Sequence, residues 1–339
     1  MTIICLTIDL GGGTVEKIKQ VRTDEEAVKF MGIALEHEWA VSFEYLIHAY
    51  SMPKAKFFYQ DPVLKSRADV RGQTIQIGID EMYHALQLGI VIRQMGGEPS
   101  FRTDDVVRYP RIIENLKRDK MTEDQVTDLY QSAKVENPAY AKLENMALNI
   151  SCDEVRHSRQ FAVMIETLKN SGAEEALCFK TTPEAERKPE VRMIHDIMRS
   201  ENELMHAYLK SVILFSEHQD LFQRLFKNSI DHMRHWDKNS GLLIKLGSVL
   251  KIENGEIDPA GVERSTSPMP RVRGGEDRIS ALESLLPAEE MLIGKYEALL
   301  AAIPDGEIKD QLGSQLALKR EHLFTQEWLL KNARKIKGL

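Results

Sequence analysis

Apolar residues recur at intervals of three and four along most of the chain, which is the spacing of one face of an α-helix. The clearest case is residues 24–50, where the pattern persists for about seven turns. A Gly-Gly pair, a common helix stop, closes the second such stretch. The first half is therefore predicted to contain four helices, over 24–50, over 65–95, from Thr122 to the ENPAY segment (136–140), and from there to about Asn170.

The same scheme restarts in the second half, with helices predicted over 185–217, 219–247, 279–302 and 307–336. The stretch 253–277 is rich in Gly, Pro and Ser, so a loop is predicted there, and FKTTPEAERKPE (179–190) is predicted to be a linker. Four helices in each half predict an all-α protein of two tandem four-helix bundles. The predicted domains are an arm (1–22), a first bundle (23–172), a linker (173–188) and a second bundle (189–339).

Composition narrows the function classes without naming one. With 42% hydrophobic and 29% charged residues, the chain has the balance of a soluble globular protein. A net charge of −7 argues against nucleic acid as a partner. Three scattered cysteines are too few for a disulfide framework, which favours a cytoplasmic location. No apolar run reaches the roughly 18 residues that a membrane helix requires, so no membrane partner is expected.

One motif occurs twice: Ile-Asp-x-Met-x-His stands at 79–84 and again at 230–235. In the first copy Glu81 precedes His84 by three residues, and a second pair of this kind, Glu154 and His157, stands in the predicted fourth helix. Residues three apart share a helix face, so each pair directs a carboxylate and an imidazole toward one point. A third Glu-x-x-His, Glu203 and His206, falls about half a turn away from the inward face of its helix, and we interpret it as a chance match.

The other two helices of the first half supply the remaining carboxylates. Glu38 and Glu123 each stand seven residues before a tyrosine, and Glu123 precedes Glu154 by 31 residues (123 to 154). Four carboxylates converging on a bundle core are costly to bury without a cation. The sequence therefore predicts a two-metal site, in the arrangement of ferritin-like di-iron and di-manganese proteins, with the ligands Glu38, Glu81, His84, Glu123, Glu154 and His157.

Further residues are predicted to support these ligands. Asp80 and Asp153 each stand four residues before a ligand histidine and are expected to accept a ring N–H, which fixes the ring. Tyr45 and Tyr130 are expected to donate hydrogen bonds to the ligand carboxylates. The alternative to a metal site is that the glutamates and histidines form solvated faces or polar networks and that both tyrosines are ordinary core residues.

The stretches HEWAVSFEYLIHAYSM and IDEMYHALQLGIVIRQMGGEPSF resemble the ferritin-like superfamily, over about residues 34–170. They are similar to bacterioferritin and to the ferritin-like domains of bacterial natural-product enzymes. The resemblance implies oxygen or peroxide chemistry at a carboxylate-bridged pair of metals, most often iron, with manganese as the alternative. The spacing from Glu38 to Glu81 is 43 residues (38 to 81), about a dozen longer than the second spacing, and the surplus lies around 52–70.

The second half keeps this spacing but loses half of the carboxylates. Glu201 and Glu289 each stand seven residues before a tyrosine, whereas histidine and lysine replace the other two glutamates, at His232 and Lys319. A mononuclear site is one interpretation, and a degenerate bundle retained for packing or dimerisation is the other. The candidate ligands of such a site are Glu201, His232, His235, Glu289 and His322.

We therefore expect a non-haem di-iron or di-manganese carboxylate oxidase or oxygenase that uses O2 or peroxide to oxidise a small organic substrate. No haem is expected, because the methionines follow apolar faces, and a homodimer is left open. Two alternatives remain, a ferroxidase or other iron- or peroxide-handling protein and a non-catalytic scaffold. A substrate-sized pocket beside Glu38 and Glu123 would favour the oxygenase.

Overall fold

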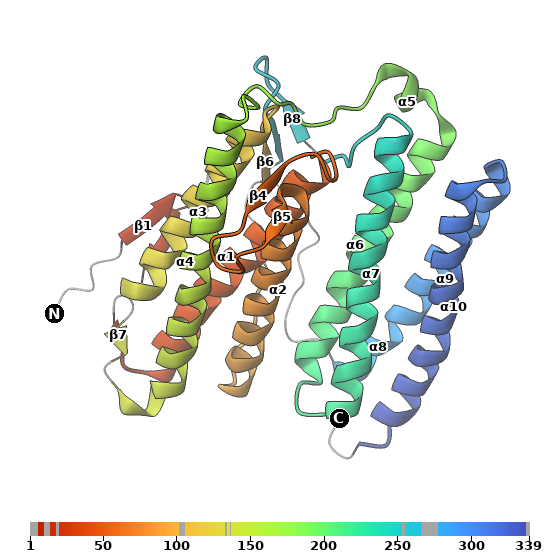
Figure 1. Ribbon diagram of the computed structural model, residues 1–339. Helices are drawn as coiled ribbons and strands as arrows, with labels where there is room; N and C mark the ends of the chain where they lie inside the picture. Colours follow the sequence, from red (N-terminus) through yellow and green to blue (C-terminus); the bar gives the residue numbers. More distant parts are fainter. Residues whose placement is uncertain are drawn as a thin grey trace. The chain divides into compact units, whose positions relative to one another are not determined.

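The computed structural model describes residues 6–9, 14–17, 20–101, 106–132, 134–135, 137–252, 255–265 and 277–336. The described chain is mostly helical with a few short strands, as expected of an all-α protein (Figure 1). It divides into two compact units. Unit 1 comprises the described residues of Met1–Phe179 and Ile252–Arg271, and unit 2 comprises those of Lys180–Lys251 and Val272–Leu339.

Four long helices form the frame of unit 1, and a short 3-10 turn, η1 (Pro138–Tyr140), lies between the third and the fourth. In this frame α1 packs on α2, α3 packs on α4, and further contacts join α1 to α3 and α2 to α4. The helices are α1 (Asp24–Tyr50), α2 (Val70–Gln94), α3 (Ile112–Ser132) and α4 (Ala141–Asn170).

The prediction for α1 is confirmed at both ends, whereas α2 and α3 begin elsewhere. The side chain of Thr23 accepts the Glu26 N–H and Glu26 bonds back to the Thr23 N–H, a capping box that begins α1. Helix α2 begins five residues later than predicted because Asp69 caps it. Helix α3 begins ten residues earlier than predicted, since Thr122 is no cap: its hydroxyl donates to the Arg118 carbonyl oxygen inside the helix.

Short strands complete unit 1. Strands β1 and β2 pair antiparallel, β3 pairs parallel with β7, β4 pairs antiparallel with β5, and β9 pairs antiparallel with both β6 and β8. Gly11–Gly13 and Cys5 of the predicted arm lie outside the described residues. The strands are β1 (Leu6–Asp9), β2 (Thr14–Lys17), β3 (Gln20–Val21), β4 (Phe58–Gln60), β5 (Arg67–Asp69), β6 (Val106–Arg108), β7 (Lys134–Val135), β8 (Gly255–Ile257) and β9 (Glu263–Ser265).

Strands β8 and β9 correct the prediction of a plain loop at 253–277, although residues 253–254 and 266–276 of that stretch lie outside the described residues. They belong to unit 1, not to the second predicted bundle, because β9 pairs with β6 and Glu263 forms an ion pair with Arg108. The periodicity of the sequence cannot predict a pairing between strands so far apart along the chain.

The surplus segment at 52–70 folds into the β4–β5 hairpin and packs on α4 (Figure 1). Asp61 follows β4 and accepts hydrogen bonds from Tyr59 (2.8 Å) and from Gln160 (2.7 Å) of α4. Tyr59 is also part of the buried apolar cluster that contains Tyr45 and Phe161. Gln160 is one turn beyond His157, so the hairpin is anchored next to the predicted metal ligands.

Unit 2 repeats the packing scheme of unit 1: α6 packs on α7, α9 on α10, and further contacts join α6 to α9 and α7 to α10. The predicted helix 185–217 is divided, because Lys188 precedes a proline and adopts an extended conformation. The helices are α5 (Pro183–Arg187), α6 (Pro189–Leu214), α7 (Gln219–Lys245), α8 (Arg278–Glu283), α9 (Leu285–Ala302) and α10 (Glu307–Ala333).

The close approach of α1 and α2 depends on Gly78. A Cβ atom there would lie 3.0 Å from the Ser42 carbonyl oxygen and 3.3 Å from the Leu46 side chain. We expect Gly78→Ala to lower the free energy of unfolding by about 1–3 kcal/mol, as measured by denaturant titration. Gly32→Ala on α1, where no atom lies within 4 Å of the added Cβ, is the matched control and should raise it by up to about 1 kcal/mol. Equal effects of the two substitutions would contradict this account of the helix contact.

Candidate metal centre

The six predicted ligands come together in the middle of the α1–α4 frame. Each stands near the centre of its helix, and all are buried, from 0% exposure for Glu38, Glu81 and His157 to 4% for His84. The frame thus places four carboxylates and two imidazoles where bulk water cannot solvate them. Such burial is costly for unpaired carboxylates.

The ligands form two overlapping groups. One comprises Glu38, Glu81, His84 and Glu154, and the other comprises Glu81, Glu123, Glu154 and His157. Within each group, one donor atom from every residue lies within 4.8 Å of the others. Glu81 and Glu154 belong to both groups, which is the position of bridging ligands.

Glu81 directs one oxygen toward each histidine. Its Oε2 lies 2.9 Å from Nδ1 of His84, and its Oε1 lies 2.7 Å from Nδ1 of His157. Glu154 Oε1 lies 3.1 Å from the same nitrogen of His84, whereas Glu38 and Glu123 are farther from their histidines, at 3.5 and 3.7 Å. The two outer carboxylates therefore have the positions of terminal ligands.

The aspartates hold the histidine rings, but each holds the ring of the other helix. Asp153 of α4 lies 3.3 Å from Nε2 of His84 on α2, and Asp80 of α2 lies 3.3 Å from Nε2 of His157 on α4. Each aspartate thus faces a ligand histidine, but the one on the neighbouring helix and not the one four residues later on its own helix. Arg156 lies 3.0 Å from both aspartates and ties them together. With Nε2–H donated to an aspartate, Nδ1 of each ring is available to a metal.

The crossed pairing can be tested by coupling. Asp153→Asn should lower the affinity for one of the two metal ions by about 10–100-fold, the usual effect of losing the carboxylate behind a ligand histidine. In a His84→Ala background the same change should have little further effect, whereas in a His157→Ala background it should keep its full effect. Metal affinities measured by competition with a chelator provide the readout. Coupling to His157 in place of His84 would contradict the crossed arrangement.

The two predicted tyrosines differ in their shortest hydrogen bond. The Tyr130 hydroxyl donates to Glu38 Oε1 at 2.5 Å, as expected. Tyr45 instead donates to the backbone carbonyl oxygen of Asp119 at 3.3 Å, one turn before Glu123 on α3. Tyr45 also interacts with the ligand carboxylate of Glu123: burial first, and then the charge and hydrogen bond of Glu123, raise the pKa of Tyr45 well above its usual range.

Burial and mutual repulsion shift the pKa values of the central carboxylates. Burial, together with the charge of Glu123, raises the pKa of Glu81 to about 7, and burial with the charge of Glu81 raises the pKa of Glu154 well above its usual range. Burial also acts on Glu38, but the hydrogen bond and charge of His84 outweigh it and lower its pKa to about 2. The cluster thus resists holding all of its carboxylates ionised without added positive charge.

The donor set fits a pair of metal ions. Among the described residues, Glu38 Oε2, Glu81 Oε1, Glu154 Oε1 and both carboxylate oxygens of Glu123 accept no hydrogen bond of good geometry. Buried oxygens without a donor are rare in folded proteins and call for an explanation. Carboxylates and imidazoles are common metal ligands, so these clusters could hold metal ions.

A third acidic cluster next to the centre was missed by the sequence reasoning. Glu44, His48 and Asp119 also lie close enough together to hold a metal. However, both ring nitrogens of His48 already have partners, Asp119 at 2.7 Å and the Val107 carbonyl oxygen at 2.6 Å, and Arg118 pairs with Glu44. The available signal was the spacing of four between Glu44 and His48. We interpret this cluster as a link between α1 and α3.

The predicted ligands of unit 2 also converge, around a lysine. Lys319 is fully buried, and its Nζ lies 2.7 Å from Glu201 and 2.8 Å from Nδ1 of His232. His235 lies on the same side, 3.3 Å from Glu201. An ammonium group thus stands among side chains that correspond to metal ligands of unit 1, as the sequence predicted.

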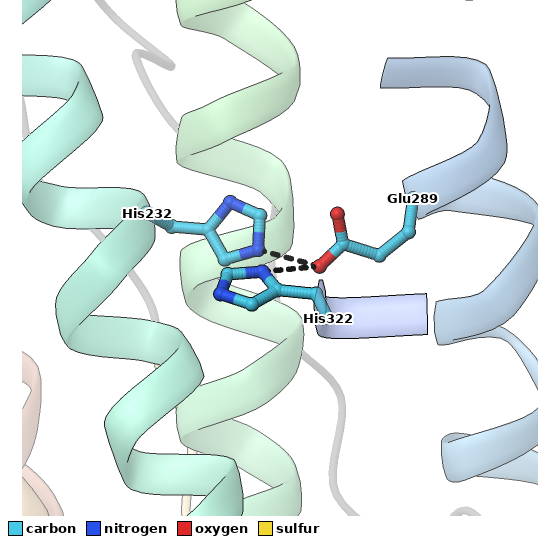
Figure 2. A group of neighbouring side chains, drawn as sticks. All are labelled: His232, Glu289 and His322. Carbon is cyan, nitrogen blue, oxygen red and sulfur yellow. Dashed lines mark hydrogen bonds and ion pairs between the residues drawn. The ribbon is translucent and has the colours of Figure 1, made fainter. Parts of the chain in front are cut away.

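The other residues of unit 2 gather around Glu289. His232 Nε2 lies 2.9 Å and His322 Nδ1 lies 3.0 Å from its Oε1 atom (Figure 2). The two tyrosines of this half contact the carboxylates reciprocally, Tyr208 with Glu289 at 2.8 Å and Tyr296 with Glu201 at 2.6 Å.

The Glu203 and His206 pair does not form a site. Glu203 is exposed, whereas His206 is buried and its pKa is lowered to about 3 by burial. Glu201 is the glutamate that faces inward, in agreement with the spacing of 31 residues to His232.

No helix in the described part of the chain combines the length and apolarity that crossing a membrane requires. Comparison with protein-family models, with curated proteins and with solved structures finds no significant match to this chain.

Proposed function

We propose that the chain consists of two tandem ferritin-like four-helix bundles and that unit 1 holds a carboxylate-bridged pair of iron ions, with manganese as the alternative. Support for the bundles comes from the identical helix-packing scheme of the two units. The observation that carries the metal pair is that Glu81 and Glu154 belong to both ligand groups. Two cations held at short range need such shared anionic ligands.

The activity proposed for this centre is oxidation of a small organic substrate with O2 or peroxide. When bound, the two metal ions would supply the redox chemistry. The chain's own residues fix the ligands: Tyr130 holds Glu38 by a hydrogen bond, and Asp80 and Asp153 hold the histidine rings. Burial of all six ligands keeps bulk water from them. The substrate pocket beside Glu38 and Glu123 stays a prediction.

The proposal is tested by loading the full-length chain anaerobically with Fe(II) and, separately, with Mn(II), followed by elemental analysis and O2 uptake. Two ions that depend on the unit 1 ligands, with O2 consumption and a new near-ultraviolet band, would support the centre. O2 consumption that stops after one turnover in a screen of organic reductants and substrates would favour a ferroxidase instead. No bound metal under either condition would leave a scaffold.

A further inference from the structure

The residues of unit 2 can be matched one by one with the ligands of unit 1, because the helix order and the spacings are shared. Glu201, His235 and Lys319 take the positions of Glu38, His84 and Glu154, whereas His232, Glu289 and His322 take those of Glu81, Glu123 and His157. The first three correspond to one half of the two-metal site, and the last three correspond mainly to the other half.

Lys319 occupies the half of the unit 2 cluster that corresponds to Glu38, His84 and Glu154 of unit 1. Its ammonium donates to Glu201 Oε2 at 2.7 Å, the same oxygen that lies 2.5 Å from Nδ1 of His232. In the corresponding half of unit 1 the neighbours are Glu38, Glu81 and Glu154, without a cationic side chain at this position. A fixed positive charge therefore stands where one of the two metals would bind.

The second half keeps a complete set of donors. His232 Nε2 and His322 Nδ1 both point at the carboxylate of Glu289, each within 3.0 Å of Oε1 (Figure 2). Glu289 has no exposed surface, and its Oε2 accepts no hydrogen bond from any residue that the structure describes. Two imidazoles and one carboxylate with an unused buried oxygen thus converge from α7, α9 and α10.

The outer nitrogens of the two rings support the same assignment. Nδ1 of His232 faces Glu201 at 2.5 Å, with Lys319 Nζ 2.8 Å from the same nitrogen, and Nε2 of His322 faces Asp231 at 3.4 Å. Each ring therefore has a carboxylate behind it. Asp231 corresponds to Asp80 of unit 1. The aspartate behind the other histidine was not retained, because Leu318 takes the place of Asp153. Only the half without the lysine keeps its supporting carboxylate, which is the arrangement expected for a liganding histidine.

We propose that unit 2 binds one divalent transition-metal ion through His232 Nε2, His322 Nδ1 and the carboxylate of Glu289, and that the Lys319 ammonium replaces the second ion. Two histidines and one carboxylate bind divalent iron, manganese, cobalt or zinc and leave further coordination positions open. The metal ion balances the negative charge of Glu289, and the ammonium of Lys319 balances that of Glu201. The site is independent of the metal pair of unit 1.

The test uses the full-length chain with Glu81→Ala and Glu154→Ala, so that unit 1 no longer contributes, and titrates it with Co(II), followed by elemental analysis and visible absorption. We expect one Co(II) per chain. Adding Glu289→Gln or His322→Ala should remove it, with affinity falling by more than about 100-fold. His235→Ala, which changes the lysine side of the cluster, is the matched control and should keep one Co(II).

Circular dichroism and thermal unfolding of each variant show whether it is folded. If a variant does not fold, the wild-type chain gives the same information, because it should bind three Co(II) and the Glu289→Gln chain two. A folded unit 1 variant that binds no Co(II), or one whose Co(II) persists after both Glu289→Gln and His322→Ala, would overturn the proposal and leave a charge-balanced hydrogen-bond network.

The converse change provides a second test. Lys319→Glu combined with His232→Glu recreates the donor set of unit 1 and should raise the capacity of unit 2 from one Co(II) to two. If capacity stays at one or falls to none in a folded chain, the assignment of Lys319 as the replacement for a metal ion is wrong.

Discussion

Replacing Glu81 and Glu154 by alanine is expected to remove both metal ions from unit 1, with affinity falling by more than about 100-fold at each position. The loss exceeds the 10–100-fold typical of residues behind a ligand, because each glutamate belongs to both ligand groups. Elemental analysis after anaerobic loading measures the number of bound ions, and competition with a chelator measures the affinities. Removal of only one ion by the double substitution would show that these glutamates do not bridge.

The same substitution should change the stability of the metal-free protein only slightly, so that loss of metal can be distinguished from loss of the fold. Burial and the neighbouring carboxylates raise the pKa values of both residues, so each ionised form is unfavourable inside the helix frame. Truncation leaves a cavity that opposes this gain, and the net change is therefore expected to be small. Glu144→Ala, an exposed position on the same helix as Glu154, is the control and should change neither metal content nor stability.

Lys319→Met is expected to have the largest effect on stability, a loss of about 3–5 kcal/mol from the free energy of unfolding of unit 2. Glu201 is fully buried and, despite the cost of burial, the charge of Lys319 lowers its pKa well below the usual range. Removing the ammonium leaves a buried carboxylate without its main cation. Denaturant titration followed by circular dichroism provides the measurement.

Two further variants make this result specific. Glu201→Gln in the Lys319→Met background should recover much of the loss, because the uncompensated charge is removed along with the cation. Lys331→Met, at an exposed position of α10, should stay within about 0.5 kcal/mol of the parent chain. If Lys319→Met and Lys331→Met had equal effects, the buried ion pair would not be a determinant of unit 2 stability.

The parts of the fold that depend on local periodicity could be predicted from the sequence. The bounds of α1 and the position of α7 follow from the three-and-four spacing, and the end of α4 follows from Gly172, whose φ is +68°. Thr122 misled the prediction for α3, because a residue type that caps helices can equally bond to the preceding turn. Local signals alone cannot separate these two roles.

The ligand positions were predictable for a different reason: the three-residue spacing fixes which side chains share a helix face, and the 31-residue spacing between Glu123 and Glu154 recurs between Glu201 and His232. The crossed aspartates, the contact of Tyr45 with Asp119 and the Glu44–His48–Asp119 cluster were not predictable, because they depend on which helices are neighbours and how they are rotated. Strand β9 belongs to the same class, since the residues that it pairs with in β6 are 155 or more residues away along the chain (108 to 263).

That strand pairing has a consequence for biosynthesis. Domains generally fold as units during translation, from the N-terminal end. Here β6 and Arg108 meet β9 and Glu263 only after the ribosome has added α6 and α7. Unit 1 thus leaves the ribosome with its helices complete and its small sheet unfinished. A nascent chain arrested before residue 255 would lack strands that the finished protein uses, and a gene cut after residue 179 would never supply them.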